Sequence, residues 1–163
     1  MRLSPETFPI IEGHEPAASN AIAGTCNELC LKNANGVLII VHEDFAVDAN
    51  HLVITIHEGQ TAAEALAGTA VVAATFPAWL CVASQTSDAL VRVATDAATY
   101  TLDFVTATNN GLFVCYIPAA ILSAGYDWIQ PDFAAGDAGN IASVLYILDG
   151  ARYQQATPPT AIA

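Results

Sequence analysis

The stretch His51-Leu-Val-Ile-Thr-Ile-His57 decides the fold class, because its side chains follow a period of two. Leu52, Ile54 and Ile56 would share one face of a β-strand, and the residues between them would share the other. A period of two is typical of a strand and argues against an amphipathic helix. Just upstream, Val37-Leu-Ile-Ile-Val-His-Glu43 is a nearly continuous apolar run, which predicts a strand buried on both faces.

Similar short runs of β-branched and aromatic residues recur about every ten positions along the chain. They predict strands over residues 28–32, 71–73, 76–83, 90–94, 99–106, 111–117, 128–133 and 141–148. The rest of the sequence predicts few helical residues, and no motif repeats at a fixed period. The sequence therefore predicts an all-β fold, an antiparallel β-sandwich or jelly roll of about eight to nine short strands.

Helical turns and tight turns are predicted between some of these strands. Thr61-x-x-Glu64 resembles a capping box that precedes Gly68, although a plain loop fits these residues equally well. Residues 118–124 begin with a proline and precede Gly125, which predicts one short helix. Asn109-Asn110-Gly111 predicts a hairpin turn, because Asn and Gly both accept positive φ.

The two ends of the chain differ in composition from the strand-rich middle. Residues 1–24 contain three prolines and two glycines without periodicity, so they predict an extended N-terminal arm and not a packed element. Residues 25–148 are predicted to form the sandwich domain. Residues 149–163 contain consecutive prolines and predict an extended C-terminal tail.

The composition limits the classes of partner. The 163 residues carry a formal net charge of −12 with four scattered cations, which disfavours direct binding to nucleic acid or to anionic membranes. No apolar run reaches the roughly 18 residues of a membrane helix, and no secretory signal is apparent, so we expect synthesis in a reducing cytosol. Only 12% of residues are charged while 54% are hydrophobic. Such a surface predicts a homo-oligomer or other partner contacts, the alternative being a monomer with a surface of small residues.

Residues that could carry chemistry are few. The four cysteines predict free thiols, because Cys26 and Cys30 lack the second ligand pair of a structural zinc site. His42 could approach His51 across a hairpin with Glu43 or Asp44 nearby, a conceivable metal site, although such histidines are usually solvated. Neither Ser123 nor Ser143 has the flanking glycines of a nucleophile elbow, and most aspartates fall in predicted turns. We therefore expect no enzyme activity, no bound metal and no cofactor.

The aromatic residues offer two interpretations. Trp79, Tyr126, Trp128, Phe133, Tyr146 and Tyr153 could form a sugar-binding platform, but core packing is the simpler role, with Trp79 and Trp128 inside strands.

A resemblance to a known group of proteins lies mainly in the last third of the chain. Its motifs are Gly125-Tyr-Asp-Trp-Ile-Gln-Pro-Asp132, Gly136-Asp-Ala-Gly-Asn-Ile-Ala-Ser-Val-Leu-Tyr-Ile-Leu148, Ala151-Arg-Tyr153 and Pro158-Pro-Thr-Ala-Ile162. These resemble small structural virion proteins encoded among the head and tail genes of tailed bacteriophages. The stretch Leu29–Val41, followed by Leu52–Gly59, is similar to the first hairpin of those proteins.

The resemblance implies a non-enzymatic capsid decoration or cement protein, located on the virion, that binds the major capsid protein or other virion subunits. Alternatives are a tail or neck component, a receptor-binding protein that recognises carbohydrate, and a polysaccharide hydrolase. Arms that reach neighbouring subunits would add many weak contacts. The candidate contact residues lie in those arms: Arg2, Phe8, Ile10, Arg152, Tyr153, Pro158 and Pro159.

Overall fold

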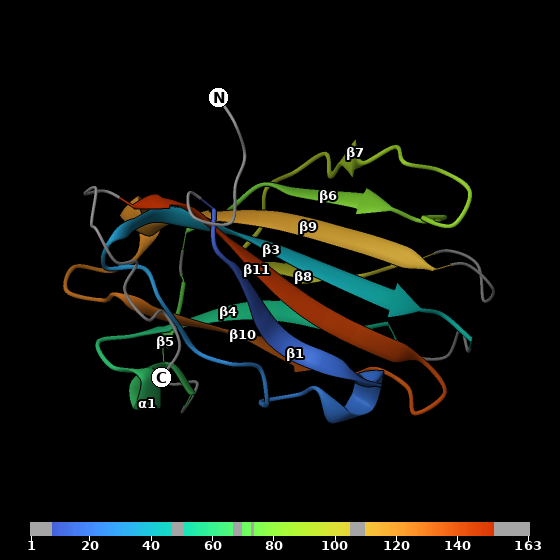
Figure 1. The fold of residues 1–163 in the computed structure, drawn as a ribbon, viewed down its shortest axis with the longest axis horizontal. Coiled ribbons are helices and arrows are strands. Elements are labelled where there is room, and N and C mark those ends of the chain that lie inside the picture. The colour runs from blue at the N-terminus through green and yellow to red at the C-terminus, as the bar shows by residue number, and fades with distance from the viewer. Residues whose placement is uncertain (1–7, 47–50, 67–69, 73, 105–109, 152–163) are drawn as a thin grey trace.

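The computed structural model describes residues 8–46, 51–66, 70–72, 74–104 and 110–151. Over these residues the chain forms two antiparallel β-sheets packed face to face (Figure 1). The all-β sandwich predicted from the sequence is confirmed. Eleven strands are described in place of the eight or nine expected, and the strand that lies outside every predicted range is β1, Ile10–Ala18.

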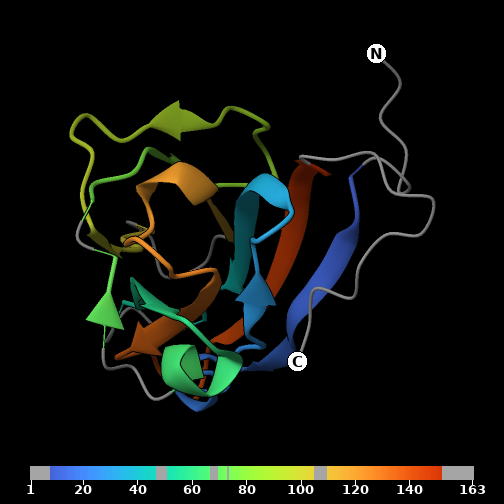
Figure 2. The same cartoon turned by 90° about the vertical axis from the view of Figure 1, so that its left-hand side faces the viewer.

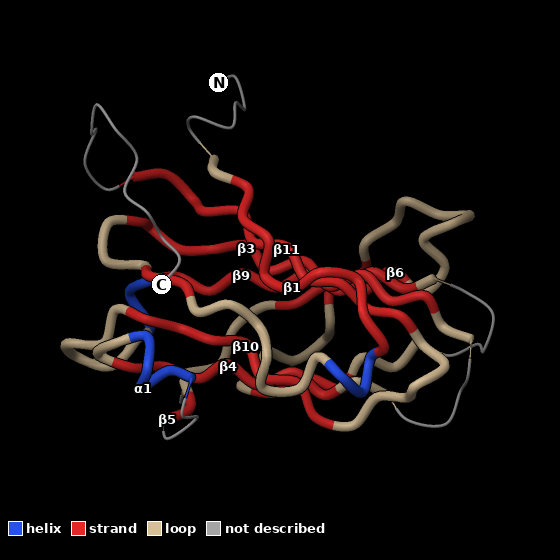
Figure 3. Tube along the Cα trace, turned by 60° about the horizontal axis from the view of Figure 1, so that its bottom comes forward, coloured by secondary structure: helices blue, strands red, loops and turns tan. Residues whose placement is uncertain are grey.

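The larger sheet has six strands in the order β1-β11-β3-β9-β6-β7. Their bounds, in that order, are Ile10–Ala18, Ile141–Ala151, Ala34–Asp44, Gly111–Pro118, Ala78–Cys81 and Val91–Arg92. The smaller sheet has the order β2-β10-β4, with β5 and β8 both paired to the free edge of β4. Its strands are Leu29–Cys30, Trp128–Ala134, Val53–Gly59, Ala70–Val71 and Thr99–Thr101. Figure 3 shows the two layers, with β4 and β10 in one and β3 and β9 in the other.

The strands pair in a nested order. The first strand, β1, pairs with the last, β11, then β2 with β10, β3 with β9, and β4 with β5 and β8. Successive pairs lie alternately in the larger and the smaller sheet. The chain is thus one long hairpin whose two halves wrap together around the core. In Figure 2, β1 and β11 lie side by side at one edge of the sandwich.

One core fills the space between the sheets. Leu52, Ile54 and Ile56 are fully buried, as their alternation predicts, and they share this core with residues of the larger sheet such as Ile39. The fully or nearly fully buried aromatic residues are Phe45, Phe76, Tyr100, Phe104, Phe113, Phe133 and Tyr146.

The prediction that Trp79 and Trp128 fill the core is wrong. Both side chains are half-buried, and neither belongs to the core cluster. Their chain neighbours Ala78 and Ile129 are fully buried and face inward. Since side chains alternate across a strand, the two tryptophans lie on the outer faces of the sheets.

The N-terminal segment is part of the sandwich and not a separate arm as far as it is described. Residues 10–18 form β1, the edge strand of the larger sheet, and Ile22 is fully buried in the core. The prolines misled the prediction, because proline is tolerated at the outward edge of a sheet, where its missing N–H costs nothing. Gly13 is required here, since a Cβ atom would lie 2.6 Å from Cζ of Tyr146.

The helical predictions hold in shortened form. Helix α1, Ala62–Leu66, begins after Thr61, whose Oγ1 accepts a hydrogen bond of 3.3 Å from the N–H of Glu64. Oε2 of Glu64 accepts one of 2.8 Å from the N–H of Gln60, so the capping box reaches one residue further back than usual. The helix predicted over residues 118–124 is one 3₁₀ turn, η2, Ala119–Ile121, and a second turn, η1, spans Ser19–Ala21. None of the described helices could span a membrane.

Two predicted hairpins are crossovers between the sheets. Strand β3 lies in the larger sheet and β4 in the smaller one, and the same holds for β9 and β8. Gly111, which was expected to supply positive φ to a hairpin, has no positive φ. It is needed for space, because a Cβ atom there would overlap the ring of Phe104.

Candidate functional site

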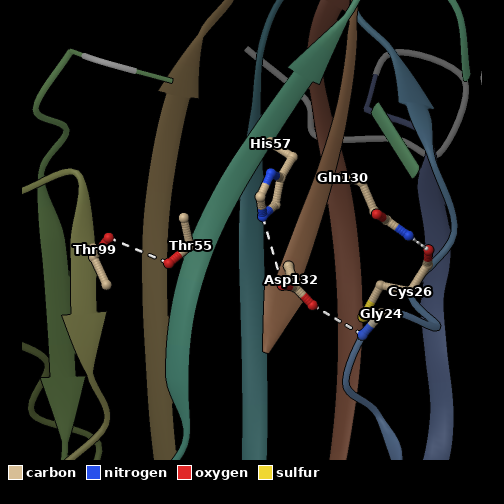
Figure 4. Close-up of polar contacts among 7 residues, drawn as sticks. All are labelled: Gly24, Cys26, Thr55, His57, Thr99, Gln130 and Asp132. Carbon is tan, nitrogen blue, oxygen red and sulfur yellow. Dashed lines mark hydrogen bonds and ion pairs between the residues drawn. The ribbon is translucent and has the colours of Figure 1, made fainter. Parts of the chain in front are cut away.

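A cluster of polar side chains lies on the outer face of the smaller sheet (Figure 4). Directly paired residues of antiparallel strands share one face, and the register pairs Thr55 with Asp132 and His57 with Gln130. Thr55 is also paired with Thr99 of β8, and their Oγ1 atoms lie 3.2 Å apart. The sheet thus places five polar residues from three strands on one surface.

His57 and Asp132 lie next to each other in this cluster. Nε2 of His57 lies 3.5 Å from Oδ2 of Asp132, while Oδ1 of Asp132 accepts a hydrogen bond of 2.9 Å from the N–H of Gly24. The amide of Gln130 donates to the carbonyl oxygen of Cys26 at 2.8 Å. The connection from η1 to β2 therefore runs along β10 and is hydrogen-bonded to it at two points. This packing is consistent with Gln130 being only 1% exposed.

In many catalytic triads a carboxylate orients an imidazole, and the other nitrogen of that imidazole contacts a nucleophile. Nδ1 of His57 is buried, and among the described residues it has no hydrogen-bond partner. The nearby thiol of Cys26 is unsuited to the role, because burial, and to a lesser extent the charge of Asp132, raise its pKa to about 12. Of the two residues, Asp132 holds the loop, through its hydrogen bond from the N–H of Gly24.

Glu43 is the second unusual group, and it lies on the inner side of β3. The residue is fully buried, and neither carboxylate oxygen has a hydrogen-bond partner among the described residues. Burial raises the pKa of Glu43 to about 7, against a smaller lowering by the neighbouring Ser19 and Asn140. The hydroxyl of Ser19 is already bonded to the backbone of Asp137, and Oδ1 of Asn140 accepts from the N–H of Ala46.

The metal site considered around His42 and His51 is not assembled by the fold. The His51 ring stacks on Phe45 at 5.6 Å, and its Nε2 lies 3.6 Å from Oδ1 of Asp103. His42 is exposed on the outer face of the larger sheet. Strand β3, which carries His42, and strand β4, which follows His51, belong to different layers. Within the described ranges, no group of three or more histidine, cysteine, aspartate or glutamate residues could hold a metal ion.

An open hollow of about 250 Å³ lies beside β1, lined by Glu12, Gly13, His14, Glu15, Thr25 and Asn27. Its polar groups are partly engaged with the protein itself, since Asn27 donates from Nδ2 to the carbonyl of Glu12 at 2.9 Å.

The predicted contact residues are only partly described. Phe8 is half-buried, and Ile10 at the start of β1 is 62% exposed. Arg2, Arg152, Tyr153, Pro158 and Pro159 lie outside the described residues.

Sequence reasoning missed the most extensive feature, which is the outer face of the larger sheet. Residues paired across β1, β11, β3, β9 and β6 place apolar side chains side by side on that face. We call the set the apolar face; it consists of Ile10, Leu38, Ile40, Trp79, Leu112, Val114, Leu145 and Ile147.

The apolar face corrects the prediction that residues 37–43 are buried on both sides. Val37, Ile39 and Val41 face the core, whereas Leu38 and Ile40 face outward and are only half-buried. The outer face of an antiparallel sheet is commonly polar, so the run of apolar residues in the sequence was itself the signal of a second apolar surface. Leu145, at 43% exposure, lies beside Ile40 in this face.

No family model, curated protein or solved structure matches this chain.

Proposed function

We propose that this chain is a non-enzymatic structural subunit of a tailed-phage virion, a capsid decoration protein that binds the lattice of the major capsid protein. The observation that carries the proposal is the apolar face. In this face Ile10 is 62% and Leu145 43% exposed, Val114 is 7% exposed, and the other members are half-buried. Apolar surface that remains in contact with water on a protein with few charges marks a site of association. The polar clusters described above fasten loops and bring together no set of reacting groups.

The strand order supports the same assignment. Nested pairing of β1 with β11, β2 with β10 and β3 with β9 is the arrangement expected of a jelly roll, a fold found in viral capsid proteins and in lectins. A fold alone does not specify a function. The link to phage virions comes from the motifs in residues 125–162, and residues 128–134 and 141–151 of that stretch form β10 and β11.

A decoration protein acts through many copies, each of which adds weak contacts to the lattice. A rigid sandwich suits this role, since it loses little conformational freedom on binding. The high negative charge of the chain would keep unassembled copies soluble.

Cryo-electron microscopy of virions that carry the tagged protein tests the proposal. We expect its density in repeated copies on the head. Density confined to the tail would support the alternative of a tail or neck component, and absence from the particles would contradict a virion role altogether. Leu145→Glu should reduce incorporation, whereas Leu66→Glu should not, because Leu66 is similarly exposed but lies on α1 and outside the apolar face.

A second candidate is recognition of carbohydrate by a receptor-binding protein. Trp128 favours it, because its half-buried ring lies on the outer face of the smaller sheet and not in the core. Aromatic rings on a surface can stack against sugars. A glycan array with the wild-type protein and Trp128→Ala tests it: binding that Trp128→Ala abolishes would favour this candidate, and no binding at all would remove it.

A further inference from the structure

The outer face of the larger sheet has an uncharged centre and charged edges. One row of paired residues crosses all six strands in the order Glu12, Leu145, Ile40, Val114, Trp79 and Arg92. Its four central members are apolar, while an acid stands on the edge strand β1 and a base on the opposite edge strand β7. An apolar centre with a charged rim is the usual anatomy of a protein interface.

We propose that a second copy of this chain covers the apolar face, related by a two-fold axis that lies between the two faces and runs parallel to the strands. This inference deepens the proposed function and rests on it for the view that the face serves assembly: the decorating unit is then a dimer, and its contacts with the capsid lattice lie outside the apolar face. The opposite charges at the two ends of the row and the extent of the face point to this occupant.

The charges select both the occupant and the axis. A two-fold axis parallel to the strands places β1 of one copy opposite β7 of the other, so that Glu12 faces the second copy's Arg92. An axis across the strands would place Glu12 opposite Glu12, which is repulsive. Arg92 is one of four cations in a chain of net charge −12. It lies 2.7 Å from Asp96, is 51% exposed, and has further N–H groups for a second acceptor.

The same axis matches the apolar residues. It sets β11 opposite β6 and β3 opposite β9, so Leu145 meets the second copy's Trp79, and Ile40 meets its Val114. Trp79 is a large ring on an outer face, the type of residue that anchors interfaces. In Figure 1 no described helix lies across this face, and α1 packs instead against β4 and β10 of the smaller sheet.

The four long strands of the face lie about 4.8 Å apart, each with about eight residues at about 3.3 Å, and span an area of about 500 Å² before β6 and β7 are added. With β6 and β7 added, the planar area of the face is about 600 Å², which is at the lower limit of a specific interface. A standard interface buries about 800 Å² on each partner. The two copies would then stack their larger sheets about 10 Å apart, as sheets do within a sandwich.

Sedimentation equilibrium of the full chain tests the inference, because a dimer has twice the monomer mass of 17.0 kDa. We expect the wild type to be dimeric at micromolar concentration and Leu145→Glu to be monomeric. Leu66→Glu is the matched control and should remain dimeric, since it places the same charge at a similarly exposed leucine on α1.

Charge reversal tests the axis without touching the apolar centre. Glu12→Arg and Arg92→Glu should each raise the dimer dissociation constant about five- to tenfold, and the double variant should recover most of the loss. A double variant that is as weak as the single ones would overturn the proposed axis.

A wild-type chain that sediments as a monomer would overturn the inference. This outcome includes a monomer whose apolar face is covered by other residues of the same chain. The proposed function fails in a different way. If the chain is a dimer but is absent from virions, the virion role is refuted and the proposed interface is supported. If the chain is a monomer but is incorporated into virions, the interface is refuted and the virion role is supported.

Discussion

Asp132 holds His57 with one carboxylate oxygen and the backbone of Gly24 with the other, at 3.5 Å and 2.9 Å. This single side chain therefore joins β10, β4 and the connection that leads from η1 to β2. His57 is 9% exposed, so its imidazole has little water with which to replace the lost contact.

We predict that Asp132→Ala lowers the free energy of unfolding by about 1–2 kcal/mol, because the N–H of Gly24 loses its acceptor and His57 loses the neighbouring carboxylate. Asp132→Asn should cost less, since its amide oxygen can still accept from Gly24. Urea unfolding monitored by tryptophan fluorescence measures both. Asp103→Ala is the control: Asp103 is 60% exposed beside His51, and its loss should change stability by less than about 0.5 kcal/mol. Equal effects of Asp132→Ala and Asp103→Ala would contradict the role given to Asp132.

Gly111 is predicted to be required for packing and not for backbone conformation. Gly111→Ala should destabilise the protein by about 1–3 kcal/mol, because the added methyl group overlaps the ring of Phe104 in the core. If so, Phe104→Leu should cost less stability in the Gly111→Ala background than in the wild type, as a double-mutant cycle would show.

The comparison for Gly111 is Gly125→Ala. Gly125 has a φ of 84° and open space around it, so that variant reports backbone strain alone, about 1 kcal/mol. Additive effects of Gly111→Ala and Phe104→Leu would show that the two residues do not share a packing constraint.

Local patterns in the sequence were sufficient for strand positions but not for their partners. Alternation placed Leu52, Ile54 and Ile56 in the core, and the Thr61–Glu64 spacing located α1. The pairing of β1 with β11 joins segments near opposite ends of the chain, and no local pattern specifies it.

The candidate site was missed for the same reason. His57 and Asp132 meet because β4 and β10 are neighbours, although they are far apart in the sequence. The apolar run in residues 37–43 indicated that both faces of this strand are apolar. Such a run does not distinguish a strand covered by its own chain from one covered by a partner.

The buried carboxyl of Glu43 predicts a stability that falls as pH rises. Its pKa is raised from 4.5 in the unfolded chain to about 7 in the folded protein, so between these values the folded state holds a proton that the unfolded state has released. The contribution of Glu43 to the free energy of unfolding is therefore largest below about pH 4.5, and it declines as the pH rises to about 7. The full decline corresponds to about 3 kcal/mol as an order of magnitude.

Glu43→Gln isolates this effect, because glutamine has a similar shape and does not titrate. The variant should match the wild type near pH 4.5 and exceed its stability by about 2–3 kcal/mol at pH 8. Urea unfolding at a series of pH values measures the difference. A constant difference between wild type and Glu43→Gln across this range would show that Glu43 does not titrate as described.

The cysteines predict a graded reactivity toward a thiol reagent. Cys26, Cys81 and Cys115 are buried, whereas Cys30 is partly exposed at the end of β2. Burial raises the pKa of Cys26 to about 12 and also raises that of Cys115, so both lack the reactive thiolate at neutral pH. With Ellman's reagent at pH 8 we expect one fast thiol and three that react only after urea is added, because exposure of the buried thiols requires opening of the sandwich. Cys30→Ser should abolish the fast phase and leave the three slow thiols. A fast phase that persists in Cys30→Ser would place a reactive thiol elsewhere and contradict the burial of the other three.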